Sequence, residues 1–384
     1  MTDGQAMAVM HDVSGPDARR DATRTWLFEA ALPLWWEAGA DHRHGGFHDR
    51  LDRDRRPLAV PKRVRVQARQ LFVYAEAGRI GWPGPWRTAV AHGLEYLLTR
   101  YRRDDGLYRA SVNDAGAPVV DAADLYDQAF VLFGLAAAYV ATGRPPAVLD
   151  AATRLFERLA AMLAHPIAGY EESVPRTLPL RSNPHMHLLE ALLAWIDTGD
   201  GAAFVPAARA IVALALERLI DPATGAIGEY YDGDWRFAAG PAGQLREPGH
   251  QYEWAYLLDL AGRVLGGDHG AACNRLVAFG ERHGVRDGRV LFAVRADGAV
   301  LDGSSRLWAQ TERLRTMTLR ARAGDAAAVQ PAHDSQAVLD RFLDCGVPGL
   351  WRERMDVDGC WIDEAVPASS LYHIVTGLMP SIDG

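Results

Sequence analysis

The sequence has little cysteine, no long apolar run and no excess of basic charge. Its 384 residues include three cysteines, none paired in the C-x-x-C spacing of a metal or redox site. No apolar run approaches the ~18 residues that a membrane-spanning helix needs. The net charge is −8 and the 41 basic residues are scattered, which argues against nucleic acid or an anionic membrane as partner. These absences favour reduced thiols and a cytoplasmic location.

The first residues also lack the charged and then apolar pattern of a signal peptide. We expect residues 1–17 to form a flexible tail. Residues 18–384 are expected to form a single domain, because no Pro/Ser-rich linker or low-complexity segment divides them.

A turn motif recurs six times along the chain. Each copy has a glycine followed by large apolar residues and a polar stretch, as in "GGFHDRLDRDRRP" and "PGLWRERMDVDGCWIDE". The motif glycines are separated by 60, 63, 56, 63 and 61 residues. Such a regular spacing indicates six structural repeats, and the turn chemistry predicts a short β-hairpin or extended loop in each. The glycines are Gly46, Gly106, Gly169, Gly225, Gly288 and Gly349.

Between the turn motifs, apolar residues recur at i, i+3, i+4 and i+7, which predicts twelve helices, two per repeat. Helix pairs can stack into an open solenoid or close into a ring. The end repeats are as apolar as the middle ones, without the polar caps of a solenoid. The sequence therefore predicts an all-α fold, an (α/α)6 barrel with short hairpin loops at one mouth.

The second helix of each repeat carries polar residues within a turn or two of its start. Singly, each has an ordinary interpretation: a histidine as a cap, a glutamate favoured by the helix dipole, an aromatic ring in the core. Their recurrence at equivalent points of successive repeats favours a shared site at the mouth of the barrel. The residues are Arg69, Tyr126, Asp127, Asn183, His187, His250, Glu253, Trp308, Glu312 and His373.

Two of the histidines, in "SNPHMHLLEA", suggest a metal clamp at first sight. On a helix, residues two apart point in nearly opposite directions, so His185 and His187 cannot share a target. His187 shares a face with Asn183 and Glu190, whereas His185 faces the other way. This geometry predicts a structural His185 and no metal held by this pair.

These segments together resemble the N-acylglucosamine 2-epimerase superfamily, with a pattern closest to the D-mannose isomerases. The resemblance runs from about Trp26 to the end of the chain, in "RVQARQLFVYAEA", "DLYDQAFVLFGLAAAY", "NPHMHLLEALLAW", "EPGHQYEWAYLL", "RLWAQTERL" and "SSLYHI". It implies the same (α/α)6 barrel. One departure is Gln128, where many relatives are expected to have histidine.

The resemblance implies that His250 and His373 are the acid–base pair and that His187 assists. It implies substrate binding by Arg69, Tyr126, Asn183, Glu253, Trp308 and Glu312. Histidine suits proton transfer near neutral pH. Glu253, one turn from His250, is expected to set the tautomer of that histidine, and Arg69 to stabilise an enediolate. No metal or other cofactor is required.

The function expected from this resemblance is metal-free interconversion of D-mannose and D-fructose, with D-lyxose and D-xylulose as a further pair. The alternative is a sugar 2-epimerase that uses the same histidines. A neutral monosaccharide is favoured, since Arg69 and Arg246 are the only candidate cations for an anionic sugar. A glycoside hydrolase or lyase, and a non-catalytic binding protein, are rival classes. A monomer and a homodimer both remain open.

Overall fold

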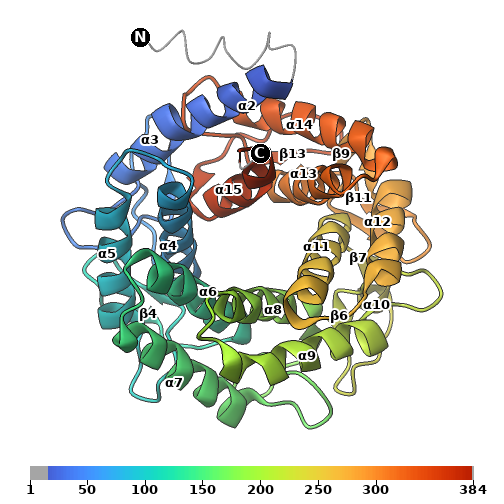
Figure 1. Cartoon of the computed structure of the whole chain (residues 1–384), viewed down its shortest axis with the longest axis horizontal. Helices are drawn as coiled ribbons and strands as arrows, with labels where there is room; N and C mark the ends of the chain where they lie inside the picture. The colour runs from blue at the N-terminus through green and yellow to red at the C-terminus, as the bar shows by residue number, and fades with distance from the viewer. Residues whose placement is uncertain (1–15, 383–384) are drawn as a thin grey trace.

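A computed structural model describes residues 16–382 as two concentric layers of helices (Figure 1). Residues 1–15 of the expected tail lie outside the described residues, and Pro16 and Asp17 begin the first helix. The inner layer has one helix per repeat, so the six predicted repeats and the (α/α)6 barrel are confirmed. The inner helices are α4 (Val64–Arg79), α6 (Leu125–Ala141), α8 (Ser182–Asp197), α11 (Pro248–Leu265), α13 (Leu307–Arg322) and α15 (Ser369–Ile382).

The outer layer contains the first helical segment of each repeat, and three of these segments include a π-helical turn. Each inner helix packs against the next one, and α15 packs against α4, which closes the ring. The outer segments are α2 (Pro16–Thr25) with η1 (Trp26–Ala31) and α3 (Leu32–Glu37); α5 (Trp86–Tyr96) with η2 (Leu97–Tyr101); α7 (Pro146–Leu163); η3 (Ala202–Phe204) with α9 (Val205–Leu214) and η4 (Ala215–Leu219); α12 (Gly270–Gly284); and η5 (Ala326–Ala328) with α14 (Val329–Leu343).

Short strands link neighbouring repeats at the mouth. In four junctions the strand that precedes an inner helix pairs with the loop of the following repeat, as β2 pairs with β3, β5 with β6, β7 with β10, and β12 with β13. A bridge between Asp124 and Ser173 makes the same link before α6. The pair β1–β14 joins the first repeat to the last, so the mouth is closed by backbone hydrogen bonds as well as by helix packing.

Hairpins within a single loop, as the sequence predicts, also occur in β3–β4, β8–β9 and β10–β11. A one-turn helix, α10 (Pro241–Gln244), lies in the fourth loop. The strands are β1 (Arg50–Leu51), β2 (Lys62–Arg63), β3 (Ser111–Val112), β4 (Pro118–Val120), β5 (Leu180–Arg181), β6 (Tyr230–Tyr231), β7 (Leu245–Arg246), β8 (Val285–Arg286), β9 (Arg289–Val290), β10 (Ala293–Arg295), β11 (Val300–Asp302), β12 (Ser305–Arg306), β13 (Arg354–Met355) and β14 (Val366–Pro367).

The repeated glycines and a repeated glutamine hold each loop against its inner helix. All six motif glycines have positive φ, between 67° and 88°, a region in which a Cβ is disfavoured. One or two residues beyond the glycine, the main-chain N–H and C=O are bonded by a buried glutamine, the fourth residue of the inner helix. The bonded residue lies one beyond the glycine in the first repeat, where Phe47 pairs with Gln67. It lies two beyond the glycine in the second, fourth and fifth repeats, where Tyr108 pairs with Gln128, Ile227 with Gln251 and Val290 with Gln310.

The third repeat has His185 at the position of these glutamines. Its Nε2 accepts from the Tyr170 N–H over 2.9 Å and its Nδ1 donates to the Arg181 carbonyl over 3.0 Å. Burial lowers the pKa of His185 to about 4, so the ring is neutral. The prediction that His185 is structural is therefore confirmed. Gln128, the departure from the expected histidine, has the same structural role in the second repeat.

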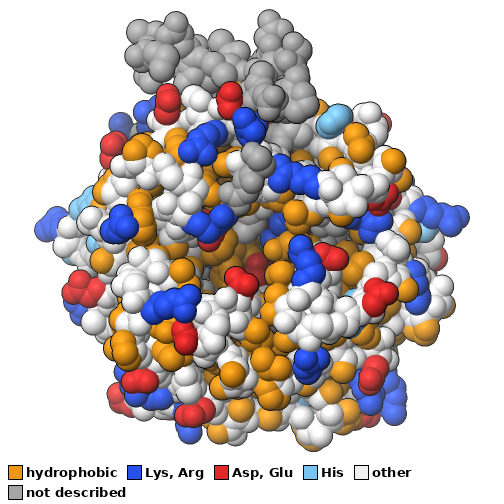
Figure 2. All heavy atoms as spheres, in the orientation of Figure 1, with side chains coloured by type: hydrophobic (Ala, Val, Ile, Leu, Met, Phe, Trp, Pro, Cys, Tyr) orange, Lys and Arg blue, Asp and Glu red, His pale blue; other side chains and the backbone are white. Residues whose placement is uncertain are grey.

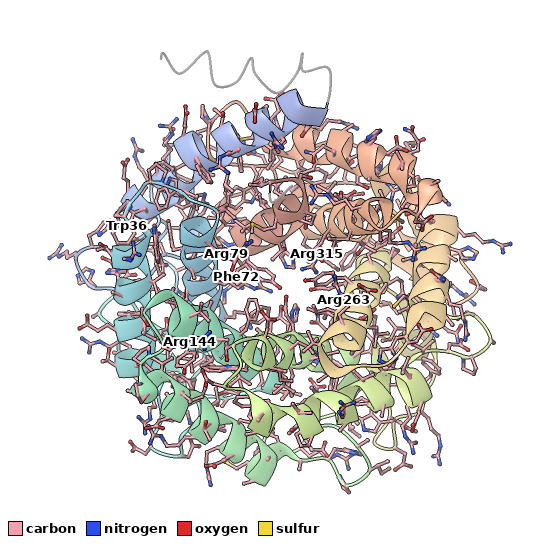
Figure 3. The ribbon with its side chains drawn as sticks, in the orientation of Figure 1. Trp36, Phe72, Arg79, Arg144, Arg263 and Arg315 are labelled. Carbon is pink, nitrogen blue, oxygen red and sulfur yellow. The ribbon has the colours of Figure 1, made fainter. Side chains whose placement is uncertain are left out.

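The inner helices pack closely against one another, and some of their side chains lie toward the inside of the barrel. A Cβ at Gly134 of α6 would lie 2.8 Å from the Ala68 Cα of α4, which shows how tightly these two helices pack. Phe72, Arg79 and Arg315 lie toward the inside of the ring, whereas Trp36 belongs to the outer layer (Figure 3). Within residues 16–382, none of the helices combines the length and apolarity needed to cross a membrane.

Candidate active site

His250 lies at the start of α11 and is bonded by a carboxylate of the preceding loop. Its Nδ1 donates to Glu229 Oε2 over 2.9 Å, and the Glu247 carboxylate lies 3.8 Å from the same nitrogen. The Trp308 ring packs on the imidazole, with 4.9 Å between ring centroids. Gly249 permits this packing, since a Cβ there would lie 2.5 Å from the indole. The Nε2 atom is therefore left for another partner.

His373 of α15 has an equivalent arrangement. Its Nδ1 donates to Glu312 Oε1 of α13 over 2.8 Å. The other oxygen of Glu312 accepts from Arg315, one helical turn further along α13. The Trp308 ring lies 6.0 Å from the His373 ring, centroid to centroid, so the indole contacts both histidines. His250 and His373 are thus both neighbours of one tryptophan ring, and each has Nδ1 bound to a carboxylate.

His187 of α8 has a carboxylate from its own helix. Its Nδ1 donates to Glu190 Oε2 over 3.1 Å, as expected for two residues on one helical face. The Tyr372 hydroxyl donates to the other oxygen of Glu190. Glu253 Oε1 lies 3.9 Å from His187 Nδ1. Burial outweighs the Glu190 contact and lowers the pKa of His187, so this imidazole is neutral near neutral pH.

The pKa values of the other two histidines are shifted in opposite directions. Burial disfavours charge on His250, but the carboxylates of Glu229 and Glu247 outweigh it and raise the pKa to about 10. Burial lowers the pKa of His373 well below its ordinary value, and the positive charge of Arg69 lowers it further. At neutral pH the His250 side chain is therefore an imidazolium and that of His373 a neutral imidazole.

Three of the predicted binding residues have a buried polar atom with no hydrogen-bond partner within residues 16–382. These atoms are Arg69 Nε, Asn183 Oδ1 and Glu253 Oε1. Orphan polar atoms are rare inside proteins, and in a site they indicate groups that a ligand satisfies. The Arg69 guanidinium also donates to the Tyr126 hydroxyl over 3.0 Å and lies 4.1 Å from the Phe130 ring centroid. The Tyr126 ring lies 5.3 Å from that of His187, centroid to centroid, so Tyr126 links the Arg69 guanidinium to this histidine.

The same donors form three groups with metal-ligand chemistry, in which the ligand atoms lie within 4.8 Å of one another. In each group the histidine contributes the nitrogen that faces a carboxylate, at 2.8–3.1 Å, which is hydrogen-bond distance. A metal ion there would replace the bonds that orient the imidazoles. The groups are His187 with Glu190 and Glu253, Glu229 with Glu247 and His250, and Glu253 with Glu312 and His373.

Two details of the sequence interpretation are wrong. The carboxylate that sets the tautomer of His250 comes from Glu229 and not from Glu253, because Glu253 points from α11 toward His187 and Glu312. Arg246, considered as a cation for an anionic sugar, is 1% exposed and donates to the carbonyls of Gly243 and Leu245. Its guanidinium therefore stabilises the fourth loop.

The sequence interpretation also missed Glu229, Arg315 and Tyr372, and it did not assign Glu190 a role. A signal for Glu229 exists in the repeats, because an acid follows the large apolar residue of the turn motif by two positions in four of them. These acids are Asp49, Glu172, Glu229 and Glu353. Arg315 and Tyr372 have no such signal, since each acts through a partner on another turn or another helix.

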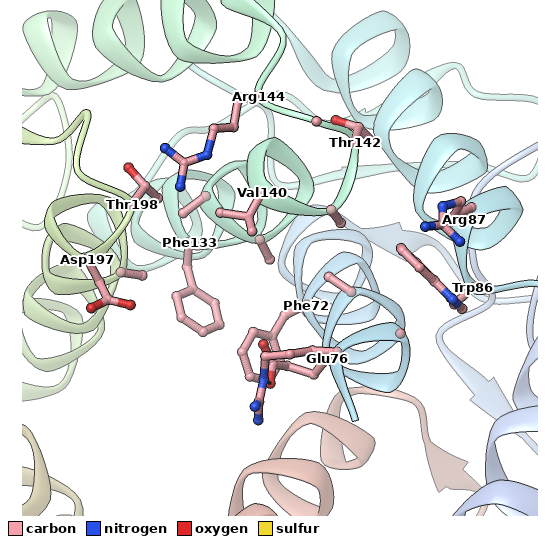
Figure 4. Close-up of a pocket in the computed structure, with 18 residues that line it drawn as sticks. Phe72, Glu76, Trp86, Arg87, Phe133, Val140, Thr142, Arg144, Asp197 and Thr198 are labelled. Carbon is pink, nitrogen blue, oxygen red and sulfur yellow. Dashed lines mark hydrogen bonds and ion pairs between the residues drawn. The ribbon is translucent and has the colours of Figure 1, made fainter. Parts of the chain in front are cut away.

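A cavity of about 910 Å³ opens at the other end of the barrel, between the C-terminal parts of α4, α6 and α8 (Figure 4). Its walls include Phe72 and Phe133, whose rings stack with 4.8 Å between centroids. Arg144 and Asp197 lie at its exposed rim (Figure 4). None of the residues predicted to form the active site lines this cavity.

Comparison with known proteins gives a consistent picture. The sequence model of the N-acylglucosamine 2-epimerase (GlcNAc 2-epimerase) family matches residues 45–377. A protein of Rhizobium meliloti (strain 1021) named mannose-6-phosphate isomerase is 39% identical over 363 residues, 92% of this chain and 94% of that protein. The D-mannose isomerase of Thermobifida fusca is 31% identical over 267 residues, 62% of each chain. The cellobiose 2-epimerase of Bacillus thermoamylovorans B4167 has the same fold, with a TM-score of 0.85, 18% identity, and coverage of 96% of this chain and 99% of that one.

Proposed function

The chain belongs to the N-acylglucosamine 2-epimerase family, and we propose that it isomerises D-mannose and D-fructose, with D-lyxose and D-xylulose as a further pair. The observation that carries the proposal is the pair His250 and His373. Both have Nδ1 bound to a carboxylate, and their pKa values are shifted apart. Titratable groups whose environments separate their pKa values are suited to be the acid and the base of one reaction.

The proposed chemistry acts on the open-chain sugar. Neutral His373 Nε2 removes the proton from C2 of the aldose, while the His250 imidazolium gives a proton to the C1 oxygen. The product is a cis-enediol. His250 then recovers a proton from the C2 hydroxyl, and His373 delivers its proton to C1. The aldose has become a ketose, and both histidines have returned to their starting protonation states.

The remaining predicted residues bind the substrate in this proposal. The orphan atoms of Arg69, Asn183 and Glu253 are available for sugar hydroxyls. Burial, followed by the charge of Glu312, raises the pKa of Glu253 well above its ordinary value, so its carboxyl is protonated and can donate. His187 and Tyr126 complete the contacts on the α6–α8 side, and the Trp308 ring provides an apolar face beside both catalytic histidines.

The glycoside hydrolase rival is disfavoured by the carboxylates. That chemistry uses two carboxyl groups about 5–9.5 Å apart across the scissile bond. Ligand oxygens of Glu253 and Glu312 lie within 4.8 Å of each other, and both oxygens of Glu312 are already bonded, to His373 and Arg315. Glu312 therefore supports a histidine in this proposal and does not act on a glycosidic bond.

A sugar 2-epimerase remains the alternative, because returning the proton to the other face of C2 requires the same groups. The test is incubation with D-mannose, D-glucose, D-fructose and D-lyxose in D2O, followed by NMR. We expect D-fructose labelled at C1 from D-mannose. Aldose labelled at C2 with no ketose would establish epimerisation, and no exchange at all would refute both activities.

A further inference from the structure

Three arginines occupy the same position in alternate repeats, directly before an inner helix. Arg63 precedes α4, Arg181 precedes α8 and Arg306 precedes α13. The first two are neutralised by the repeated acid of their own turn motif. Arg63 pairs with Asp49 at 2.5 Å, and Arg181 pairs with Glu172 at 2.6 Å.

The fifth repeat lacks this acid. Phe292 occupies the position, two residues after Val290, and the Arg306 guanidinium lies over the Phe292 ring, 4.2 Å from its centroid. Within residues 16–382 the Arg306 side chain has no hydrogen bond or ion pair. Its neighbour across the β12–β13 pair, Arg354, has its own partner in Glu364 at 2.6 Å. Arg306 is thus a partly exposed cation whose donors are unused.

Two carboxyl groups near Arg306 compensate its charge only weakly. Burial raises the pKa of Glu247 to about 7 and that of Glu353 to about 7, and Arg306 counts among the charges that oppose both shifts. Near neutral pH each is therefore only partly ionised. The Glu353 carboxyl is also occupied by the Ser370 hydroxyl, which donates to it over 2.8 Å.

Arg306 is the residue directly before α13, and Trp308, in the first turn of that helix, contacts both His250 and His373. The charge of Arg306 also acts on the carboxyl group of Glu247, which lies 3.8 Å from His250 Nδ1. Arg306 therefore borders the two histidines, and a sugar with C1 and C2 at the histidines can extend its far end toward the guanidinium.

We propose that Arg306 forms an anion subsite at the mouth, which binds a phosphate ester on the end of the sugar remote from the reacting carbons. The planar guanidinium, supported by the Phe292 ring, presents paired N–H donors that match phosphate oxygens. The inference deepens the proposed function and rests on it. It predicts that the phosphorylated aldose is a better substrate than the free one.

The test compares D-mannose with D-mannose 6-phosphate for the wild type, Arg306→Gln and Phe292→Glu. We expect the wild-type kcat/KM to be at least about tenfold higher for the phosphate ester, because a charge-assisted hydrogen bond stabilises a complex by about that factor. Arg306→Gln should remove this advantage and change kcat/KM for D-mannose less than threefold. Phe292→Glu should also remove it, because it restores the acid that Arg63 and Arg181 have.

Arg87→Gln is the matched control. Arg87 lies 4.1 Å from the Trp86 ring centroid, in a similar cation–ring contact at the other end of the barrel. Its replacement should leave both substrates unaffected. Equal kcat/KM values for the two sugars, or an equal loss for both in Arg306→Gln, would overturn the subsite.

Binding of inorganic phosphate, measured by calorimetry, separates the two proposals. The wild type should bind phosphate and Arg306→Gln should bind it at least about tenfold more weakly, with circular dichroism confirming that the variant is folded. Phosphate binding that depends on Arg306, without turnover of either sugar, would refute the proposed function alone. Turnover of D-mannose without phosphate binding would refute the subsite alone.

Discussion

The two ends of the barrel both carry charged side chains next to aromatic rings, but these side chains differ in their exposure to solvent. At the end with the 910 Å³ cavity, Arg144 and Asp197 are exposed, and Arg144 pairs with Asp200 at the surface. On the face seen in Figure 2, basic and acidic side chains are interspersed around the central hollow. At the mouth, His250 is 4% exposed and His373 7%. The charges around these histidines are desolvated, and their interactions raise the pKa of His250 to about 10.

In the proposed function, the end of the barrel with the 910 Å³ cavity is not the reactive end. Chemistry needs groups that are held in one orientation and removed from water. The carboxylates on the histidine Nδ1 atoms provide the first condition, and the inner helices provide the second. The predictions below test this contrast, beginning with the largest expected effect.

Replacing either of the two histidines that we propose as acid and base should have the largest effect. His250→Asn and His373→Asn should each lower kcat for D-mannose by about a thousandfold, because a proton-transfer group is lost. Steady-state kinetics would measure this, with circular dichroism to confirm folding. Arg144→Gln and Asp197→Asn, at the other end, should keep kcat within threefold. Comparable losses in these two variants would contradict the contrast between the ends.

Removing the charge that holds the His250 proton should have an intermediate effect. In Glu229→Gln the pKa of His250 falls from about 10 toward its ordinary value, so the imidazolium is lost at lower pH. We expect kcat at neutral pH to fall about tenfold and the alkaline limb of the kcat/KM profile to move to lower pH. Glu172→Gln changes the equivalent residue of the third repeat, which pairs with Arg181, and should leave the alkaline limb in place. An unshifted limb in Glu229→Gln would show that His250 is not the acid.

The smallest effect concerns a buried histidine at the mouth that we assign no chemistry. The folded pKa of His185 is about 4, below its unfolded value of about 6.5, so the unfolded chain takes up a proton first as the pH falls. This linkage lowers the free energy of unfolding by about 2 kcal/mol at pH 5 relative to pH 7. His185→Gln, which copies the other repeats, should remove that loss and stay within about 1 kcal/mol of the wild type at pH 7.

Urea denaturation at pH 7 and pH 5 would measure both values. His185→Ala is the comparison, because it leaves the Tyr170 N–H without its acceptor and should cost about 2 kcal/mol at pH 7. Activity of His185→Gln should remain near that of the wild type. A large loss of kcat in the folded His185→Gln variant would show that His185 contributes to the reaction as well as to stability.

Much of the fold was predictable because it depends on local chemistry repeated six times. The motif glycines all have positive φ. Such a turn favours glycine, and the regular spacing of the glycines is visible in the sequence. The i, i+4 geometry of a helix separated His185 from His187 without any tertiary information. Gln128 could not be interpreted in this way, since its partner is the backbone of Tyr108 in another element.

The site was predictable in its residue types and unpredictable in its pairings. The sequence predicted the three histidines and Arg69, Asn183 and Glu253 from their positions on inner helices, and each of the last three has an orphan polar atom. The carboxylate of His373 comes from another helix, and the Tyr372–Glu190 contact spans 182 residues. Residues so distant in sequence leave no periodic trace. The assignment of Glu253 to His250 was wrong for another reason, because the repeated acid of the turn motif, Glu229, lies 21 residues before His250 and was not interpreted.

The sequence by itself determined the number of repeats, the helical character of each and the end of the barrel that carries the polar residues. These properties follow from backbone conformation and apolar periodicity, which act over a few residues. Only the tertiary structure decided which carboxylate meets which histidine, and which arginine lacks an acid. Those facts determine the pKa values and the unused donors, because electrostatic interactions depend on burial and on distance through space, whatever the separation along the chain.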